Sequence, residues 1–153
     1  MAIITRSINT KVPEFTRVGI VQSRFNPDIV SLSLNGCLRA LAENGVLDKN
    51  IVHVTVPGAL EIPLMMVSTI ENDEVDCVVA LGAVIKGDTY HFEVVCNESA
   101  RGIAQVAMDT LTPVGNGVLT TYTEEQARER AEQKGYEAAL AALEVLNSMD
   151  PER

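Results

Sequence analysis

The stretch from Gly82 to His91 contains residue types that could bind an anion and move a proton. It follows residues 77–81, an apolar run whose length and β-branched content predict a strand buried on both faces. Asp88 and Thr89 are favourable N-cap types, so a helix is expected to begin there with N–H groups that could hold an anion. Histidine is the side chain that most readily exchanges a proton near neutral pH. The alternative is an ordinary strand–helix turn with a surface histidine.

Several other side chains could contact a ligand. Phe25 lies in a polar loop and could stack on a flat heterocycle, or it could pack on the following helix. Glu61 could accept hydrogen bonds from a ligand, or it could only complement a helix dipole. Arg130, supplemented by Lys86 and Lys134, could bind a phosphate. The acidic residues around Arg130 equally suit ion pairs on a solvated helix face.

The sequence argues against several classes of site. No Gly-x-x-x-x-Gly-Lys-[Ser/Thr], Gly-x-Gly-x-x-Gly or Gly-x-Ser-x-Gly motif is present, so nucleotide triphosphates, nicotinamide cofactors and a serine nucleophile elbow are not indicated. The three cysteines form no Cys-x-x-Cys pair, and His53 and His91 are the only histidines. We therefore expect buried thiols in a reducing compartment, and neither disulfides nor a His-rich metal site.

Composition indicates one globular domain over residues 1–153, with a lead-in at 1–15 and a frayed tail at 148–153. Hydrophobic residues make up 46% of the chain and charged residues 22%, which is ordinary for a globular protein. The formal net charge of −9 disfavours nucleic acid and anionic membranes as partners. The beginning of the sequence lacks a signal-peptide core, and no apolar run has the length of a membrane span, so a cytoplasmic location is expected.

Strand-like and helix-like patterns alternate along the chain. This order predicts an α/β fold: a flavodoxin-like open parallel sheet of four βα units with helices on both faces. The Ile3-Ile4 patch in the lead-in is expected to pair with a sheet edge, in its own chain or in a neighbouring subunit. The strands are expected at 18–21, 51–56, 77–81 and 117–121, and the helices at 27–43, 59–70, 89–111 and 123–146.

Unusual residues follow all four predicted strands. In an open parallel sheet, ligands bind beyond the carboxyl ends of the strands. The four segments that would meet there are Arg24-Phe25-Asn26, Pro57 to Glu61, Gly82 to His91 and Thr120-Thr121. Their coincidence predicts a pocket at that edge of the sheet.

Taken together and in order, these segments resemble the 6,7-dimethyl-8-ribityllumazine synthase family over about residues 16–147. The matching motifs are Arg24-Phe25-Asn26, 56–63, 82–92, 117–121, Glu125-Gln126-Ala127, Arg130-Ala131 and Lys134-Gly135. The resemblance implies the penultimate step of riboflavin biosynthesis. That step condenses 5-amino-6-(D-ribitylamino)uracil with 3,4-dihydroxy-2-butanone 4-phosphate and releases phosphate and water, without metal or cofactor.

The resemblance also implies roles for individual residues. Phe25 would stack on the pyrimidine, His91 would shuttle protons, and Arg130 would close on the phosphate held by Asp88, Thr89 and the helix that they open. Residues 59–61 would bind the pyrimidine and its ribityl chain, and residues 83–85 would contact the same ligand through their backbone. The substrate-binding set is Phe25, Ala59, Leu60, Glu61, Ala83, Val84, Ile85, Asp88, Thr89, Asn116 and Lys134.

Three departures from the family pattern affect these expectations. Asn116 occupies a place where many members have an aromatic ring, and Lys86 replaces the commoner Arg. The segment from Arg130 to Lys134 is shorter than in many members. A homopentamer with active sites at subunit boundaries is therefore predicted, and a larger shell is left open. The alternatives are a catalytically altered relative that binds a flavin-like ligand or only assembles, and a flavodoxin-like flavin-binding protein.

Overall fold

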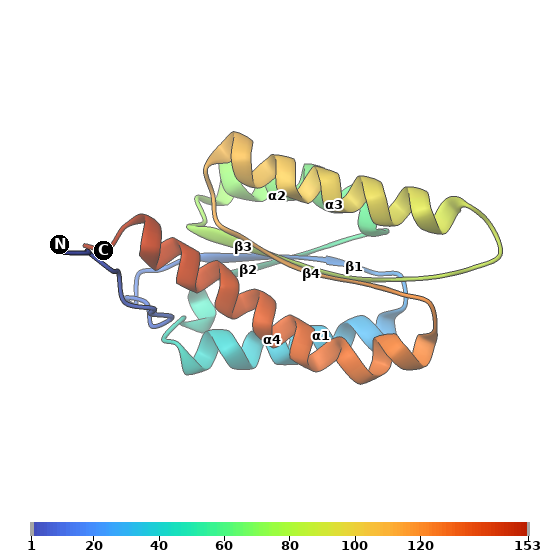
Figure 1. Cartoon of the computed structure of the whole chain (residues 1–153), viewed down its shortest axis with the longest axis horizontal. Helices are drawn as coiled ribbons and strands as arrows, with labels where there is room; N and C mark the ends of the chain where they lie inside the picture. The colour runs from blue at the N-terminus through green and yellow to red at the C-terminus, as the bar shows by residue number, and fades with distance from the viewer. Residues whose placement is uncertain (1, 153) are drawn as a thin grey trace.

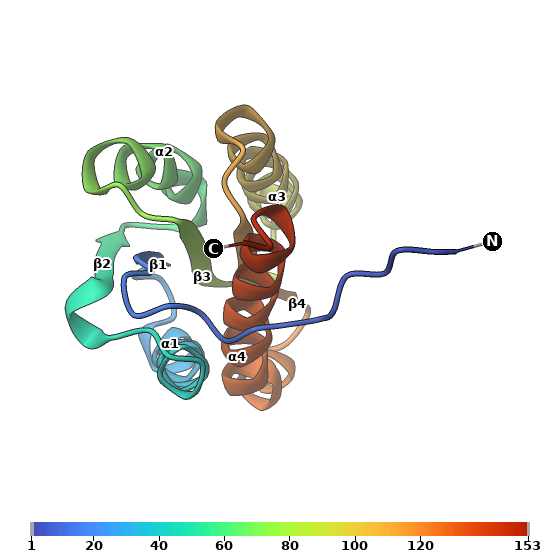
Figure 2. The same ribbon diagram turned by 90° about the vertical axis from the view of Figure 1, so that its left-hand side faces the viewer.

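Four parallel strands form one sheet in the computed structural model, which describes residues 2–152. The sheet lies between two pairs of helices (Figure 1), with α2 and α3 on one face and α1 and α4 on the other (Figure 2). The strand order is β2-β1-β3-β4, so the predicted flavodoxin-like arrangement is confirmed. The strands are β1 (Val18–Ser23), β2 (Ile51–Val56), β3 (Cys77–Ile85) and β4 (Val114–Thr121). The helices are α1 (Pro27–Glu43), α2 (Ile62–Asp73), α3 (His91–Thr110) and α4 (Glu124–Met149), with short 3-10 helices η1 (Asp48–Asn50) and η2 (Ala59–Glu61).

The central strand β3 supplies side chains to both halves of the core. Val79 and Leu81 pack in the cluster beneath α1 and α4, whereas Val78 and Ala80 pack in the cluster beneath α2 and α3. All four side chains are fully buried. A strand with strand neighbours on both sides and helices on both faces needs a continuous apolar sequence. This arrangement explains why β3 is recognisable from composition alone.

Two strands are longer than the sequence patterns predict. The strand expected at 77–81 continues to Ile85, and the strand expected at 117–121 begins at Val114. Parallel pairing between β3 and β4 extends as far as Ile85 and Thr121 and keeps Gly82 inside the strand. A Cβ at Gly82 would lie 2.7 Å from the Oγ of Ser23. Gly82 therefore permits a close approach of two strands and does not form a turn.

The starts of three helices differ in how well local sequence predicts them. The prediction that Asp88 and Thr89 cap α3 is wrong, because α3 begins at His91 after Tyr90, which makes no side-chain cap bond. The helix expected from Ala59 begins with η2 and becomes α-helical at Ile62. The spacing Thr-x-x-Gln at Thr123 and Gln126 predicts a capping box at the start of α4, and the structure confirms it: the backbone N–H of Gln126 donates to the Thr123 Oγ1 at 3.1 Å.

α4 is one uninterrupted helix and packs closely against α1 and β4. Small side chains on α4 permit this approach: Ala138, Ala139 and Ala142 are buried, whereas Ala141 is exposed. Glycines allow the closest contacts. A Cβ at Gly135 would lie 1.9 Å from the carbonyl oxygen of Ser33, a distance that no real side chain tolerates. α4 continues to Met149, past residue 148 where the frayed tail was predicted to begin.

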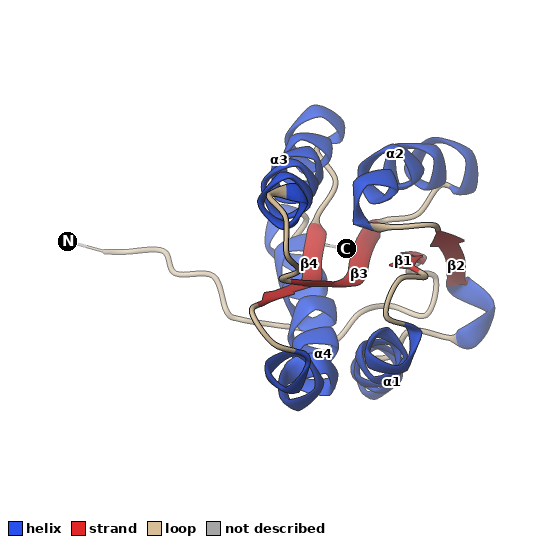
Figure 3. Ribbon diagram, turned by 90° about the vertical axis from the view of Figure 1, so that its right-hand side faces the viewer, coloured by secondary structure: helices blue, strands red, loops and turns tan. Residues whose placement is uncertain are grey.

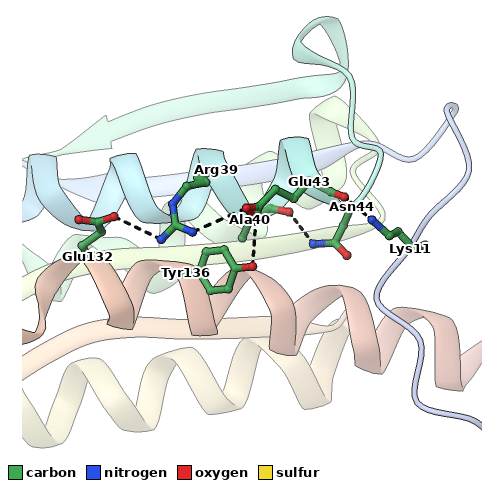
Figure 4. Close-up of polar contacts among 7 residues, drawn as sticks. All are labelled: Lys11, Arg39, Ala40, Glu43, Asn44, Glu132 and Tyr136. Atoms are coloured by element: carbon green, nitrogen blue, oxygen red, sulfur yellow. Dashed lines mark hydrogen bonds and ion pairs between the residues drawn. The ribbon is translucent and has the colours of Figure 1, made fainter.

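Polar contacts border the packed face of α1 and α4 (Figure 4). Arg39 forms an ion pair with Glu132 at 3.2 Å, and its guanidinium lies 4.3 Å from the centre of the Tyr136 ring. The Tyr136 hydroxyl donates to Glu43 at 3.0 Å, and this bond is the main cause of a raised tyrosine pKa. These groups are exposed, so we assign most of the stability of the helix pair to the buried contacts.

The lead-in does not form a strand with the chain's own sheet. The side chains of Ile3, Ile4 and Ile8 are exposed, and this segment extends away from the helices (Figure 2). Further along, the Asn147 side-chain amide donates to the carbonyls of Asn9 and Lys11 at 2.8 and 2.9 Å. The last part of the lead-in is therefore anchored, whereas Ile3 and Ile4 stay exposed. No helix within residues 2–152 is long and apolar enough to cross a membrane.

Replacing Gly135 with alanine should lower the free energy of unfolding. The added methyl group would collide with the Ser33 carbonyl oxygen. Because the collision is with backbone, we expect overpacking to cost about 3 kcal/mol, the upper end of the usual range, which exceeds the helix-propensity gain of about 1 kcal/mol and leaves a net loss of about 2 kcal/mol. Urea unfolding at one fixed protein concentration measures the difference. Gly87→Ala is the control, because a Cβ there meets nothing within 4 Å. Unchanged or increased stability of Gly135→Ala would show that α1 and α4 are not in tight contact.

Burial of Cys37 should make the protein less stable at high pH. Desolvation raises the pKa of this thiol from 9.0 to about 12. The protonated thiol is favoured in the folded state, so its stabilisation is complete below pH 9 and is lost as the pH rises toward 12. The stability advantage of the wild type over Cys37→Ala should therefore shrink by about 1.4 kcal/mol per pH unit above pH 9. Val30→Ala, a control at a buried position of α1, should show a loss independent of pH.

Candidate active site

A cavity of about 560 Å³ lies at the carboxyl ends of β1, β2 and β3. We call it the strand-end cavity. The loops that line it emerge from one end of the sheet, which faces the viewer in Figure 3. Because parallel strands end at the same edge, segments more than 20 residues apart in the chain meet there. The sequence-predicted residues that line it are Phe25, Ala59, Leu60, Glu61, Ala83, Val84, Ile85, Thr89 and His91.

Phe25 presents its ring to solvent at this cavity. The residue is 71% exposed, so the alternative prediction that it packs on the following helix is not supported. The backbone N–H of Arg24 donates to the Val56 carbonyl at 2.8 Å and continues the pairing of β1 with β2. An exposed aromatic ring on a tethered loop can stack on a planar ligand with little rearrangement.

Glu61 closes the turn between β2 and α2. Its carboxylate accepts a hydrogen bond from the backbone N–H of Gly58 at 3.0 Å. Both Gly58 and Glu61 line the strand-end cavity. Glu61 therefore stabilises the local backbone, and its exposed carboxylate also borders the ligand space, so it is placed to do more than complement a helix dipole.

A second cavity of about 700 Å³ lies between the end of β4 and the first half of α4. We call it the helix-side cavity. Arg130 and Lys134 line it together with two carboxylates, Glu129 and Glu137. The Arg130 guanidinium donates to the Gln126 carbonyl at 2.9 Å and lies 3.8 Å from Glu129. These contacts are exposed, so an incoming anion could replace them at small cost.

The two cavities border one another, yet none of their lining residues is shared. Phe92 lines the strand-end cavity, Tyr122 lines the helix-side cavity, and their ring centroids are 6.1 Å apart. The Lys86 ammonium lies 5.6 Å from the centre of the Tyr122 ring. His91 and Arg130, the two predicted catalytic residues, therefore line different cavities of one chain.

Two predicted binding residues line neither cavity. Asp88 is exposed in the loop before α3. Asn116 is exposed on β4, where its side-chain oxygen accepts from the backbone N–H of Val118 at 3.0 Å. Their roles stay predictions.

Some lining residues were not assigned a role from the sequence. Asn26 belongs to the Arg24-Phe25-Asn26 motif, but its contact with Ala83 on β3 could not be predicted, because these two residues are 57 positions apart in the chain. Phe92 belongs to the 82–92 motif but no site role is predicted for it, and none is predicted for Tyr122. The neighbouring Thr120-Thr121 pair did mark the end of β4, and both residues line the helix-side cavity.

The remaining titratable groups do not form a metal site. Within residues 2–152, no group of three or more His, Cys, Asp or Glu side chains is arranged to hold a metal ion. His53 lies on β2 away from both cavities, 2.7 Å from the Gln22 side-chain oxygen, and burial lowers its pKa. Cys96 on α3 has a raised pKa, first from burial and then from the charge of Glu93. Cys37 and Cys96 are free thiols.

Comparisons with known proteins agree with this geometry. A family model described as 6,7-dimethyl-8-ribityllumazine synthase matches residues 16–150. A protein of that name from Paracidovorax citrulli is 48% identical over 133 residues, which cover 87% of this chain and 86% of the relative. The one from Bordetella petrii is 49% identical over 142 residues, covering 91% and 81%. The one from Burkholderia mallei is 50% identical over 131 residues, covering 86% and 76%.

Proposed function

The chain belongs to the 6,7-dimethyl-8-ribityllumazine synthase family, and we propose that its two cavities are the two halves of the active site. It is an enzyme of riboflavin biosynthesis, a transferase that condenses 5-amino-6-(D-ribitylamino)uracil with 3,4-dihydroxy-2-butanone 4-phosphate. The observation that carries the assignment of the site is the strand-end cavity, in which most of the predicted substrate-binding residues and His91 meet.

The reaction needs proton transfers at several steps. The amine of the pyrimidine attacks the ketone, water leaves to form an imine, phosphate is expelled, and the ribitylamino nitrogen closes the ring on the second carbonyl carbon with loss of a second water. Each step moves a proton to or from a heteroatom or carbon. His91 lines the strand-end cavity in the first turn of α3 and is the proposed proton shuttle. A correctly placed base of this kind contributes about 10²–10⁴-fold to the rate.

The pyrimidine is proposed to occupy the strand-end cavity. The exposed ring of Phe25 would stack on the planar uracil, and the backbone of residues 83–85 would hydrogen-bond to its edge. Residues 59–61 would bind the ribityl hydroxyls. The cavity volume of about 560 Å³ suits a small ligand of this size.

The phosphate is proposed to lie where the strand-end cavity of one copy faces the helix-side cavity of a neighbouring copy. The N-terminus of α3 has no side-chain cap, so a phosphate held by Asp88 and Thr89 would face a helix N-terminus. Arg130 would supply a bidentate cation, with Lys134 beside it and Asn116 at the polar edge of the pyrimidine site. Holding both reactants in register would supply much of the remaining acceleration.

A homo-oligomer, of which the pentamer is the proposed form, would complete each site. His91 and Arg130 line different cavities of one protomer, and this separation supports a site that takes each residue from a different copy. The exposed apolar residues Ile3, Ile4 and Ile8 support donation of the lead-in to a neighbour's sheet edge. The free thiols support a reducing, cytoplasmic location.

Substitutions at the two proposed catalytic residues should have different kinetic effects. His91→Ala should lower kcat by about 10²–10⁴-fold, with affinity for the pyrimidine substrate unchanged. Arg130→Ala should raise the KM of the phosphorylated substrate by about 10–100-fold, because a charge-assisted contact is lost. Steady-state formation of the fluorescent lumazine measures both. Arg128→Ala is the matched control, since Arg128 is ion-paired with Glu124 and lines neither cavity. Wild-type turnover by both variants would refute these roles.

Mixing the two variants tests whether the site is shared between copies. If His91 and Arg130 act from different protomers, an equal mixture unfolded and reassembled should restore about a quarter of the wild-type sites. Each variant alone, treated identically, should stay impaired. An equal mixture with no more activity than the separate variants would instead indicate that both residues act within one protomer.

A further inference from the structure

From the contact between Asn26 and β3, we infer that Asn26 is a positioning residue for the pyrimidine substrate, an inference that rests on the proposed function. Asn26 precedes α1 in the left-handed conformation, with φ 55° and ψ 56°, and its side chain makes no cap bond to that helix. Its backbone carbonyl accepts from the N–H groups of Ile29 and Val30 at 3.1 and 3.0 Å. The main chain of Asn26 therefore begins α1, and its side chain is directed elsewhere.

The side chain of Asn26 reaches across to β3. Its Nδ2 donates to the carbonyl oxygen of Ala83 at 2.9 Å. A carbonyl oxygen can only accept, so this contact requires the amide nitrogen of Asn26 and not its oxygen. The bond connects the β1–α1 loop to the end of a different strand.

This bond acts where pairing between β1 and β3 has ended. The last paired residues of those strands are Gln22 and Leu81, whereas β3 continues to Ile85 with only β4 beside it. Ala83 lies two residues beyond the last pair. On the side of β3 that faces β1, Asn26 thus supplies to Ala83 a hydrogen bond that strand pairing no longer provides.

The same bond holds the Phe25 loop. Phe25 is 71% exposed, so core packing does not fix its position. The loop is held on one side by the Arg24 N–H to the Val56 carbonyl of β2 and on the other by the Asn26 amide to β3. Phe25 is proposed to contact the face of the pyrimidine, and residues 83–85 are proposed to contact its edge. Asn26 therefore sets the distance between the Phe25 ring and the backbone of β3 that is proposed to hydrogen-bond to the edge of the pyrimidine.

Two substitutions separate the hydrogen bond from the backbone conformation. Asn26→Gly keeps the left-handed backbone accessible and removes the donor. Asn26→Asp keeps the shape and also tolerates this conformation, but it places a carboxylate oxygen against the Ala83 carbonyl. Glu74→Gly is the control, because Glu74 also has a left-handed backbone, with φ 52°, and it lines neither cavity.

Calorimetric titration with 5-amino-6-(D-ribitylamino)uracil alone measures the effect on positioning. We expect the Kd of both Asn26 variants to rise about tenfold, the size of one lost hydrogen bond. The KM for the phosphorylated substrate should change by less than about twofold, since Asn26 does not contact the helix-side cavity. Glu74→Gly should leave both constants unchanged. Melting curves of all three variants report whether the fold is intact.

An unchanged pyrimidine Kd in the variants that fold would overturn the inference. An equal loss of affinity for both substrates, together with a large drop in melting temperature, would also overturn it, because that pattern indicates general loosening. If Asn26→Gly does not fold, Asn26→Asp decides the question. The proposed function fails separately: a wild-type protein that binds the pyrimidine but forms no lumazine contradicts the function and leaves the role of Asn26 in binding intact.

Discussion

The close approach of α4 to the rest of the molecule is the constraint on which the other features depend. Three glycines make it possible. A Cβ at Gly36, Gly115 or Gly135 would lie 1.9–2.0 Å from a carbonyl oxygen, those of Glu132, Ala138 and Ser33 respectively. Larger side chains would push α4 away from both α1 and β4, because packed interiors do not absorb such overlaps. The position of Arg130 and Lys134 beside the end of β4 is therefore set by backbone contacts made elsewhere along α4.

The sheet separates the two parts of the proposed site. α3 carries His91 on one face, and α4 carries Arg130 on the other. At the ends of the strands, the two helix layers approach each other where the ring of Phe92 on α3 lies 6.1 Å from the ring of Tyr122, which follows β4. Both parts of the site lie at the ends of strands that the sheet holds rigidly, so substrate binding requires little movement of the chain. A neighbouring copy can supply the other half of the site without disturbing the core.

Binding of the phosphorylated substrate depends on the basic side chains near the cavities and not on the net charge of the chain. The chain has a net charge of −9, which opposes the approach of a phosphorylated substrate. Lys86, Arg130 and Lys134 form a small basic group beside the two cavities, although Glu129 and Glu137 line the helix-side cavity with them. Solvent screens charges beyond about 8–10 Å, so these near groups dominate over the distant acidic surface.

Local patterns in the sequence determined the element order, the parallel α/β class, the capping box at Thr123 and the segments that form the strand-end cavity. These features depend on periodicity and on residues close together in the chain. Tertiary structure alone decided that Gly82 lies inside β3, that α3 begins at His91, that Asn26 bonds to Ala83 and that His91 and Arg130 line different cavities. Each of these depends on strand pairing or packing between residues distant in sequence, and no local pattern specifies which backbone groups will meet.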